Sequence, residues 1–363
     1  MAETDIVAGL TPQQWDDKFY VEHVQGNRFS GEMGADENAV IQLKEELSDK
    51  PGDSITYALV NRLTGAGVTN GGTLEGNEEE MDQRSFVLSI SERANAVVHT
   101  NWSAQKSAID LREASKVTLK TWAMENTRDR IITELGSING VAYGSASEAQ
   151  KDAWLVDNAD RCLFGAALGN NSSNDHSASL ANIDNTADKL TASALSLMKR
   201  MARTASPKIR PIMSSSDDSK YYYICYVPSL VMRDLRADTT ITAAQREVQI
   251  KMQNEKLFKG GDIEWDGIIV KEIEDIAVLS GVGAAGIDVA PVYLCGAQAV
   301  GYGIGQRWKT TDETRDYGRK MGCAINEMGD FAKLTFGTNA SSDTGDLKDH
   351  GVLTGFFASV ADS

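Results

Sequence analysis

The most recognisable spacing of chemistry-bearing residues is Gly281-Val-Gly-Ala-Ala-Gly286, which matches the GxGxxG pattern of dinucleotide-binding turns. In such turns the glycines open a helix whose N-terminus holds the pyrophosphate, and an acidic side chain follows about 20 residues later. Here the β-like segment Ile287–Cys295 follows instead, and Gln306 and Arg307 stand near the acidic position. The pattern therefore predicts a loop between strands and no bound dinucleotide.

Neither the histidines nor the serines form a recognisable catalytic or metal-binding group. The four histidines lie far apart, without an HExxH or HxH spacing: His23, His99, His176 and His350. Ser103-Ala-Gln-Lys106 matches SxxK, but the SDN and KTG partners of that motif are absent. The sequence predicts that the chain is not an enzyme and has no metal site and no cofactor.

A basic cluster, Lys199, Arg200 and Arg203, stands near the end of a predicted helix, and Lys208 and Arg210 continue it. Cations stabilise a helix C-terminus, so a solvated, helix-capping face is one interpretation. The other is a docking site for an acidic element of a neighbouring copy. The acidic residues that would supply this element are close together in the sequence: Glu75, Glu78, Glu79 and Glu80.

The charge of the chain is strongly acidic and unevenly distributed. Its 363 residues carry 36 Lys and Arg against 52 Asp and Glu, a net charge of −16, which disfavours binding to a phosphate backbone. Residues 1–100 hold 18 acidic and 7 basic side chains, so −11 of the −16 falls there. Such a segment gains little by folding on itself. We expect it to be flexible or to lie against a less acidic surface supplied elsewhere.

The cysteines and the apolar stretches predict a protein made in a reducing cytoplasm, without a membrane anchor. The cysteines include no close pair, so we expect reduced, buried thiols at Cys162, Cys225, Cys295 and Cys323. The first residues lack the basic and apolar regions of a secretory signal. The weakly charged stretch Ile276–Gln306 contains seven glycines, and so favours buried strands over a membrane span.

The first 100 residues predict an arm followed by a hairpin. Residues 1–50 are acidic, with isolated apolar anchors such as Trp15 and Phe19. Strand-like runs at Ile55–Val60 and Phe86–Ser91 flank a stretch rich in Gly and Glu, which predicts a long β-hairpin with a mobile tip. A connection this long inside a compact domain is usually functional or a linker.

Helical periodicity is strongest between Ser103 and Leu135, where no Gly or Pro occurs. A largely apolar set repeats there with heptad spacing: Ala114, Val117, Thr121, Met124, Ile131 and Leu135. We expect the charged side chains, Arg128 and Arg130 among them, on the remaining, solvated faces. The segment predicts a spine helix packed on a sheet, with a coiled-coil dimer as the alternative. A shorter helical pattern covers Ala39–Leu47.

After Leu135, strand and helix patterns follow one another in mixed order. Residues 137–188 predict loops with short helices, and Thr191–Ala202 predicts an amphipathic helix. Strand patterns occur at 209–213, 221–227, 262–265, 268–273, 292–295, 331–336 and 352–357, and helical patterns at 229–236 and 242–257. The chain as a whole therefore predicts an α+β fold.

This order of elements resembles the major capsid proteins of tailed bacteriophages with the Hong Kong 97-type fold, in the branch found in Enquatro-type podophages. Three stretches carry the resemblance most clearly: Lys220–Arg236, Pro291–Val300 and Tyr317–Phe336. The resemblance covers most of the chain and rests on structural patterns. It implies an icosahedral shell of pentamers and hexamers, which encloses double-stranded DNA without sequence-specific binding.

The resemblance also divides the chain. It implies, in chain order, an N-terminal arm at 1–50, an extended loop (β-hairpin) at 51–100, a peripheral domain at 101–219 with the spine helix 103–135 and an insertion at about 137–188, an axial domain at 220–299, and return strands of the peripheral domain at 300–363. Contacts between copies would then involve the acidic loop, the basic cluster, and Trp15 and Phe19 of the arm.

Partners follow from the same resemblance. Some shells of this fold are welded by an isopeptide bond from a loop lysine to an asparagine. No lysine stands between Lys50 and Lys106 here, so we expect a shell held by non-covalent contacts. Scaffolding and portal proteins, and in some shells a decoration protein, are the further expected partners. A nanocompartment shell around cargo enzymes, and another structural protein of the virion, are the alternatives.

Overall fold

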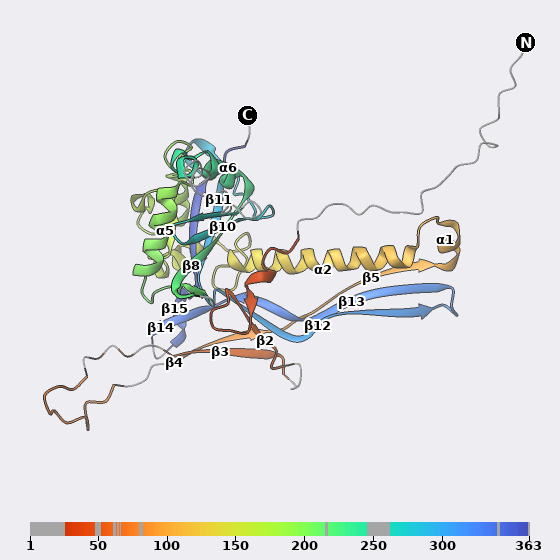
Figure 1. Cartoon of the computed structure of the whole chain (residues 1–363), viewed down its shortest axis with the longest axis horizontal. Helices are drawn as coiled ribbons and strands as arrows, with labels where there is room; N and C mark the ends of the chain where they lie inside the picture. Colours follow the sequence, from red (N-terminus) through yellow and green to blue (C-terminus); the bar gives the residue numbers. More distant parts are fainter. Residues whose placement is uncertain are drawn as a thin grey trace, which may run out of the picture. The chain divides into compact units, whose positions relative to one another are not determined.

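The computed structural model describes residues 26–47, 52–60, 63, 65, 67–79, 83–214, 217–244, 262–339 and 342–361. The chain divides into two compact units (Figure 1). The first contains Glu92–Thr127 and Gln306–Met328, and the second contains Arg28–Ser91, Arg128–Gly305 and Gly329–Ser363. Helix α2 (Leu111–Leu135) and strands β12 (Val300–Arg315) and β13 (Lys320–Lys333) contribute residues to both units.

The first unit combines two helices with three strands. Strand β5 (Glu92–Thr100) pairs antiparallel with β13 (Lys320–Lys333), next to β12 (Val300–Arg315) in the sheet. On the sheet lie Leu119 and Ala123 of α2 (Leu111–Leu135), which pack against Cys323 and Ile325. The indole of Trp122 meets Trp308 edge to face, with ring centroids 5.8 Å apart. This arrangement confirms the predicted packing of a long helix on a sheet.

The predicted helix 103–135 is interrupted near its start. A short helix, α1 (Asn101–Lys106), precedes α2, and each helix begins at its own capping residue. Thr100 accepts a hydrogen bond from Ser103 N at 3.1 Å, and Asp110 accepts one from Arg112 N at 2.9 Å. Such caps satisfy the amides that a helix leaves unpaired at its start, so two caps produce two helices.

The buried face of α2 also differs from the predicted one. The buried residues advance by four, as Ser115, Leu119, Ala123 and Thr127 in the first unit and Ile131 and Leu135 in the second. Only Ile131 and Leu135 belong to the predicted heptad set, and Val117 is 38% exposed. Small and hydroxyl-bearing residues such as Ser115 can pack against a sheet as closely as apolar ones. A prediction that counted only apolar residues therefore chose the wrong face of α2 in the first unit.

The core of the second unit is a mixed sheet in the order β6-β16-β11-β8-β10-β9, with β7 paired to β8. Its strands are β6 (Cys162–Phe164), β7 (Ile212–Ser214), β8 (Asp217–Val227), β9 (Ile263–Trp265), β10 (Ile268–Glu272), β11 (Val289–Cys295) and β16 (Val352–Ala358). Strands β11 and β16 are buried along their whole length, as continuous apolar runs predict.

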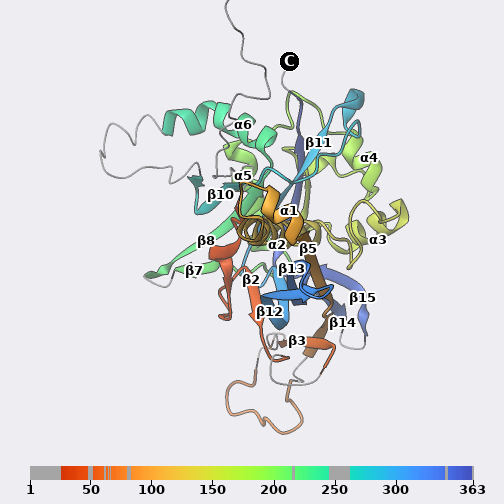
Figure 2. The same ribbon diagram turned by 90° about the vertical axis from the view of Figure 1, so that its right-hand side faces the viewer.

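Helices flank this sheet (Figure 2). Helices α5 (Ala192–Thr204) and α6 (Ser229–Ala237) pack on one face, where they share a core with alternate residues of β8 and β11. The other face packs against Ile131 and Leu135 of α2. Helices α3 (Glu148–Asp157) and α4 (His176–Ala181) form a further core with β6. The predicted α+β class is confirmed.

Three smaller elements complete the second unit. Strands β3 (Ser54–Val60) and β4 (Gln83–Ser89) form the predicted hairpin, with Val60 opposite Gln83. Strands β14 (Thr335–Asn339) and β15 (Ser342–Asp349) form a second hairpin. The glycine pattern forms a loop with one 3-10 turn, η4 (Ala284–Gly286), which leads directly into β11. That loop confirms the predicted strand connection.

One prediction for the chain's secondary structure is wrong. The segment Ala39–Leu47 is not helical, because Ile41–Lys44 forms β2, which pairs in parallel with β1 (Met33–Gly34) and with β12. Burial of Val40 and Ile41 in the core decides this outcome over local periodicity. The local strand patterns missed most of β12 and β13, although the resemblance implied return strands at 300–363, because much of β12 is polar and exposed on both faces. The predicted helix 242–257 falls largely outside the described residues.

All four cysteines are buried thiols, as predicted. Within the described ranges, no helix combines the length and apolarity needed to cross a membrane.

Candidate functional site

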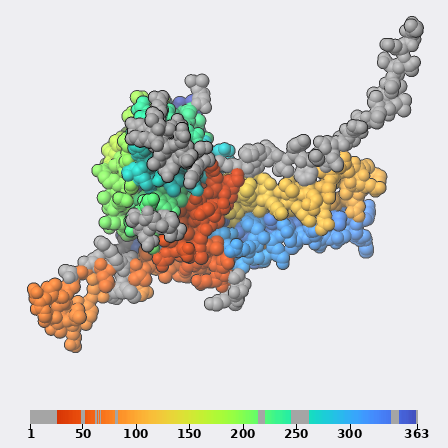
Figure 3. All heavy atoms as spheres, in the orientation of Figure 1, coloured from red at the N-terminus to blue at the C-terminus, as the bar shows by residue number. Residues whose placement is uncertain are grey.

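The loop between β3 and β4 carries the acidic residues predicted to contact a neighbour. Figure 3 shows it as a narrow, exposed projection in orange. Glu75, Glu78 and Glu79 are exposed, whereas Glu80 lies outside the described residues. Glu79 accepts a hydrogen bond from Gly65 N, and Glu78 one from Gly76 N, both at 2.7 Å. Three carboxylates are therefore exposed to solvent, and two of them accept hydrogen bonds from the backbone of the same loop.

The base of this hairpin is fixed to the core. Arg84 is 3% exposed, and its Nε donates to the Gly337 carbonyl at 2.8 Å. Ile55, Tyr57 and Leu88 pack with the residues around β14. Burial raises the pKa of the Tyr57 hydroxyl well above its ordinary value. The hairpin is thus anchored at one end, and its acidic loop stands at the other.

The basic cluster sits at the C-terminal end of α5. This helix starts at the cap Thr191, whose hydroxyl accepts from Ala194 N at 3.3 Å, and it buries Leu195, Met198 and Met201. Arg200 and Arg203 are exposed at its end. Arg203 also lines a hollow of about 400 Å³ with Lys220, Tyr221, Tyr222, Glu264, Gly267 and Ile269.

Other members of the cluster are occupied within the same chain. The Lys199 ammonium donates to the backbone carbonyl of Asp266 and, at 2.8 Å, to its carboxylate. Arg210 pairs with Glu37 at 3.0 Å. Arg200 and Arg203 are thus the predicted contact residues of this cluster that α5 presents on the surface.

The aromatic residues predicted for the arm, Trp15 and Phe19, lie outside the described residues. The described chain reaches the second unit at Arg28, whose guanidinium donates to the Glu272 carbonyl at 3.0 Å. Phe29 follows, fully buried against Tyr226 with ring centroids 4.7 Å apart. The described later part of the predicted arm 1–50 is therefore part of the core of the second unit.

Sequence reasoning missed an exposed apolar surface on the first unit. Val98, Trp102 and Met321 are exposed there by 51%, 67% and 37%. Lys106 lies over the Trp102 ring at 4.3 Å and covers part of it. The signal in the sequence is the run Ala94–Val98, in which three apolar residues follow Asn95 without a polar residue between them. On a strand, such a run places apolar side chains on both faces. Exposed apolar surface of this kind is typical of protein contacts.

Two arginines predicted to be solvated are buried instead. Arg128 is 5% exposed and pairs with Asp275 at 3.0 Å. Arg130 is 9% exposed, pairs with Asp330 at 2.9 Å and lies over the Phe331 ring. Both guanidiniums thus stabilise the second unit from the end of α2. Charge alone gave no sign of this, because the partner carboxylates are far away in the sequence.

A cavity of about 410 Å³ lies beside that end of α2 in the second unit. Its walls are mostly apolar, with Arg128 and Asp275 among them, and it also includes Ile132, Tyr143, Pro291 and Phe356. Burial raises the pKa of Tyr143 and Tyr293 above their ordinary range.

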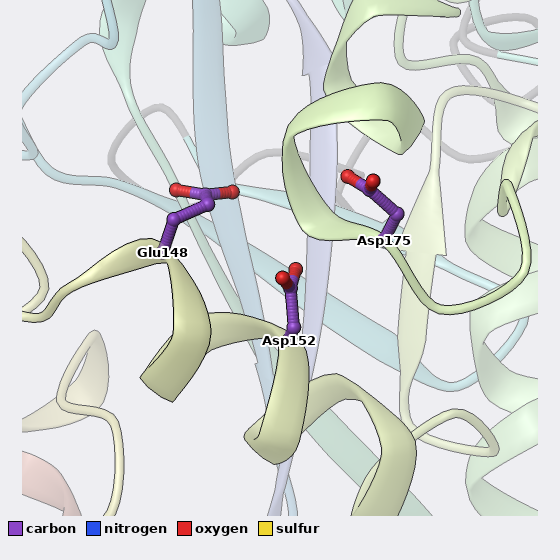
Figure 4. A group of neighbouring side chains, drawn as sticks. All are labelled: Glu148, Asp152 and Asp175. Carbon is purple, nitrogen blue, oxygen red and sulfur yellow. The ribbon is translucent and has the colours of Figure 1, made fainter.

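Three carboxylates converge between α3 and α4: Glu148, Asp152 and Asp175 (Figure 4). Oxygens of the three residues lie within 4.8 Å of one another. Hydrogen bonds from Ala178 N and Ser177 lower the pKa of Asp175. The sequence predicted no metal site, and this group has no motif spacing, because it depends on the fold bringing residue 175 to residue 148.

Comparison with known proteins relates the chain to phage capsid proteins. A model of the phage capsid protein family matches residues 4–359. The major capsid protein of Pseudomonas phage KPP25 is 26% identical over 357 residues, which cover 90% of this chain and 89% of that protein. Among solved structures, the capsid asymmetric unit of cyanophage Pam1 has a TM-score of 0.88 at 30% identity, and the capsid of Ralstonia phage GP4 one of 0.76 at 20%, each over the whole of both chains.

These likenesses decide between the interpretations that the sequence left open. The fold is shared along the full length with phage capsid structures, which confirms the predicted Hong Kong 97-like α+β class. The family consists of structural capsid proteins, which confirms the prediction that the chain is not an enzyme. By a match that spans nearly the entire sequence, the chain belongs to the phage capsid protein family.

Proposed function

We propose that this chain is the major subunit of a phage head, in which pentamers and hexamers form an icosahedral shell around double-stranded DNA. We further assign it to the branch of the Hong Kong 97-type fold found in Enquatro-type podophages. The observation that carries the proposal is the likeness to the cyanophage Pam1 capsid, with a TM-score of 0.88 over all of both chains. A fold conserved over its entire length retains the surfaces through which shell subunits meet.

The parts of the chain take the roles that this organisation implies. Residues 1–50 form the arm, of which the described part from Phe29 to Lys44 packs in the second unit, and residues 51–100 form the extended loop. Residues 101–219 and 300–363 form the peripheral domain, and residues 220–299 the axial domain. The hairpin β3–β4, with its fixed base and exposed acidic loop, supports the role of the second segment.

In this proposal the acidic loop of one subunit contacts Arg200 and Arg203 of another. The loop is exposed at Glu75, Glu78 and Glu79, and the two arginines are exposed at the end of α5. Opposite charges that are each exposed in the single chain attract one another during assembly and fix the register of the contact. Trp15 and Phe19 of the arm would add apolar contacts with a neighbour.

The test is a charge exchange between the two elements. Arg200→Glu with Arg203→Glu should abolish shell formation, and Glu78→Lys with Glu79→Lys should do the same, because like charges then meet. Combining all four substitutions should restore closed particles in electron micrographs. Restoration would show a direct contact; failure of the combined variant, with each subunit folded by circular dichroism, would contradict it.

The shell is held by non-covalent contacts. The segment between Lys50 and Lys106 has no lysine, so an isopeptide bond from the extended loop has no nucleophile. Purified shells boiled in detergent should therefore run as a single band at the monomer mass. Ladders of covalent oligomers on the gel would overturn this proposal.

Assembly takes place in the host cytoplasm, with scaffolding and portal proteins as partners and a decoration protein as a further candidate. Four buried thiols without a disulfide suit a reducing compartment. Expression of the chain alone should give irregular particles, and co-expression with the scaffolding protein should give uniform closed shells. Uniform shells from the chain alone would count against a scaffolding partner.

A further inference from the structure

The turn between β12 and β13 in the first unit carries a fully exposed aromatic side chain. Tyr317 is 105% exposed, the highest value among the large apolar side chains that the structure describes. Its ring therefore leaves all of its apolar surface in water. Tyrosine is enriched at protein interfaces, because one rigid ring supplies a large contact area together with a hydroxyl. A ring exposed in this way suits a partner that offers a matching cavity.

The backbone of this turn is strained at the tyrosine. The φ angles of Asp316, Tyr317 and Gly318 are 54°, 51° and 87°. Tight hairpin turns favour Asn and Gly at such positions, because a bulky side chain is crowded in the left-handed region. The turn is nevertheless held in place, since Arg319 N donates to the Asp316 carbonyl at 3.0 Å and Asn101 Nδ2 to the Gly318 carbonyl at 2.6 Å. Strain of this kind is typical of functional positions.

The cavity beside the end of α2 in the second unit is large enough for such a ring. Its volume is about 410 Å³, whereas roughly 150 Å³ of apolar space holds a benzene ring inside a protein. Its walls include the side chains of Tyr143, Pro291 and Phe356, which offer apolar and aromatic contacts. Thr133 and Gly144, which also line it, are exposed, so the cavity opens to solvent.

A hydroxyl in the wall of this cavity has no partner within the described chain. Tyr293 is 5% exposed, and among the residues that the structure describes none makes a hydrogen bond to its hydroxyl. The oxygen lies beside Gly136, where an added Cβ would be only 2.7 Å away. Buried polar groups are nearly always hydrogen-bonded, so this hydroxyl indicates an occupant that carries a polar atom. The hydroxyl of a second tyrosine can both donate to it and accept from it.

The charges around the turn and the cavity are opposite in sign. Asp129 and Asp275 line the cavity and share the Arg128 guanidinium, at 3.1 Å and 3.0 Å, which leaves one negative charge. The two basic residues that follow the turn, Arg319 and Lys320, are exposed and outnumber the one acidic residue within it. Complementary charges favour the encounter of the two surfaces and fix their orientation.

We propose that Tyr317 of one copy of this chain inserts its ring into the cavity of a second copy and hydrogen-bonds to Tyr293 there. The occupant belongs to another copy, because the ring is fully exposed in the single chain. The proposal rests on the proposed function, since shell assembly is what brings copies together. It uses neither the acidic loop nor the basic cluster on α5, so it is a separate contact.

The test measures binding of a cyclised peptide of residues 312–321 to the unassembled full-length chain by isothermal titration. The peptide should bind once per chain. A peptide with Tyr317→Asn should bind at least about tenfold more weakly, because it keeps the turn and loses the ring. p-Cresol, which reproduces the tyrosine side chain, should displace the wild-type peptide. Absence of saturable binding, equal binding of the two peptides, or failure of p-cresol to compete would overturn the proposal.

Two variants of the full-length chain locate the site. Tyr293→Phe should weaken peptide binding about fivefold and leave the urea midpoint unchanged, since this hydroxyl has no partner in the described chain. The matched control is Tyr226→Phe, because the hydroxyl of Tyr226 is also buried without a hydrogen bond but does not line the cavity. This control should bind the peptide as the wild type does, and equal binding by both variants would overturn the assigned site.

Shell formation by the wild type is scored separately in electron micrographs. Closed shells from a chain that does not bind the peptide would overturn this contact and leave the proposed function intact. Peptide binding by a chain that forms no shells would support the contact and count against the proposed function.

Discussion

Among single residues, the ion pair of Lys333 and Asp349 shows how charges are kept inside the second unit. The two side chains are 1% and 2% exposed, with Nζ and Oδ2 2.8 Å apart. The indole Nε1 of Trp154 also donates to Asp349 Oδ2 at 3.3 Å. Two charges in an apolar interior are tolerated only as long as each has the other.

Lys333→Met should therefore lower the free energy of unfolding by about 3–5 kcal/mol, because it leaves a buried carboxylate without its cation. Adding Asp349→Asn should recover part of this loss, since the remaining group is then neutral. Urea unfolding of the three proteins, followed by fluorescence, gives the comparison. A double variant less stable than Lys333→Met would show that the charge of Asp349 has another essential partner.

A second residue links stability to pH. His350 packs edge to face on Phe336, and loss of hydration, together with the charges of Arg161 and Arg210, lowers its pKa to about 4. The unfolded chain, with an ordinary histidine pKa of 6.5, takes up the proton first as the pH falls. The stability that the neutral ring provides is present above pH 6.5 and is lost as the pH falls toward 4.

The expected loss from this one group is about 1–2 kcal/mol between pH 7 and pH 5. In His350→Gln the corresponding part of the pH dependence should disappear, because glutamine does not titrate. Urea midpoints of both proteins at the two pH values measure the difference. Parallel losses in the wild type and the variant would assign the pH dependence to other groups.

Among the elements, strand β11 ends close to the backbone of Arg210. A Cβ added at Gly296, directly after β11, would lie 2.3 Å from the Arg210 carbonyl oxygen and 2.8 Å from Ile209 Cγ2. A Cβ at Gly144 would meet no atom within 4 Å. The same substitution thus probes a crowded and an open position.

Gly296→Ala should lower the free energy of unfolding by about 2–3 kcal/mol or more, because backbone must move to make room. Gly144→Ala should change it by less than about 1 kcal/mol, since alanine there only restricts the unfolded chain. Thermal unfolding of both variants provides the measurement. Equal melting temperatures would mean that the end of β11 yields easily.

The same elements show what the sequence could and could not predict. The β3–β4 hairpin and strands β11 and β16 were predictable, because alternation and continuous apolar runs are local signals. Most of β12 and β13 showed no local strand pattern, since their exposed halves carry charges such as Arg315, and only the resemblance implied strands there. The acidic loop was visible in composition, whereas the group at Glu148 requires α4 to return to α3. Local sequence patterns predict single helices and strands. Groups of residues from several elements can be identified only from the tertiary structure.

For the whole molecule, the proposed role of the acidic loop in assembly means that the loop is needed for shell formation and not for folding of the single chain. Excision of residues 67–79 should leave the free energy of unfolding within about 1 kcal/mol of the wild type, because Arg84 and the cluster around Tyr57 hold the hairpin at its base. Shell formation should be lost. Sedimentation velocity and urea unfolding measure the two effects, and closed particles from the shortened chain would refute the role of the loop.

The placement of the thiols gives the native chain a built-in reporter of opening. Burial raises the pKa of Cys162, Cys225 and Cys295 in the second unit, and that of Cys323 in the first. A maleimide dye can therefore react with a thiol only when its own unit opens. The labelling rate of Cys323 then measures how fast the first unit opens. The labelling rates of the other three thiols measure how fast the second unit opens, and no engineered probe is needed.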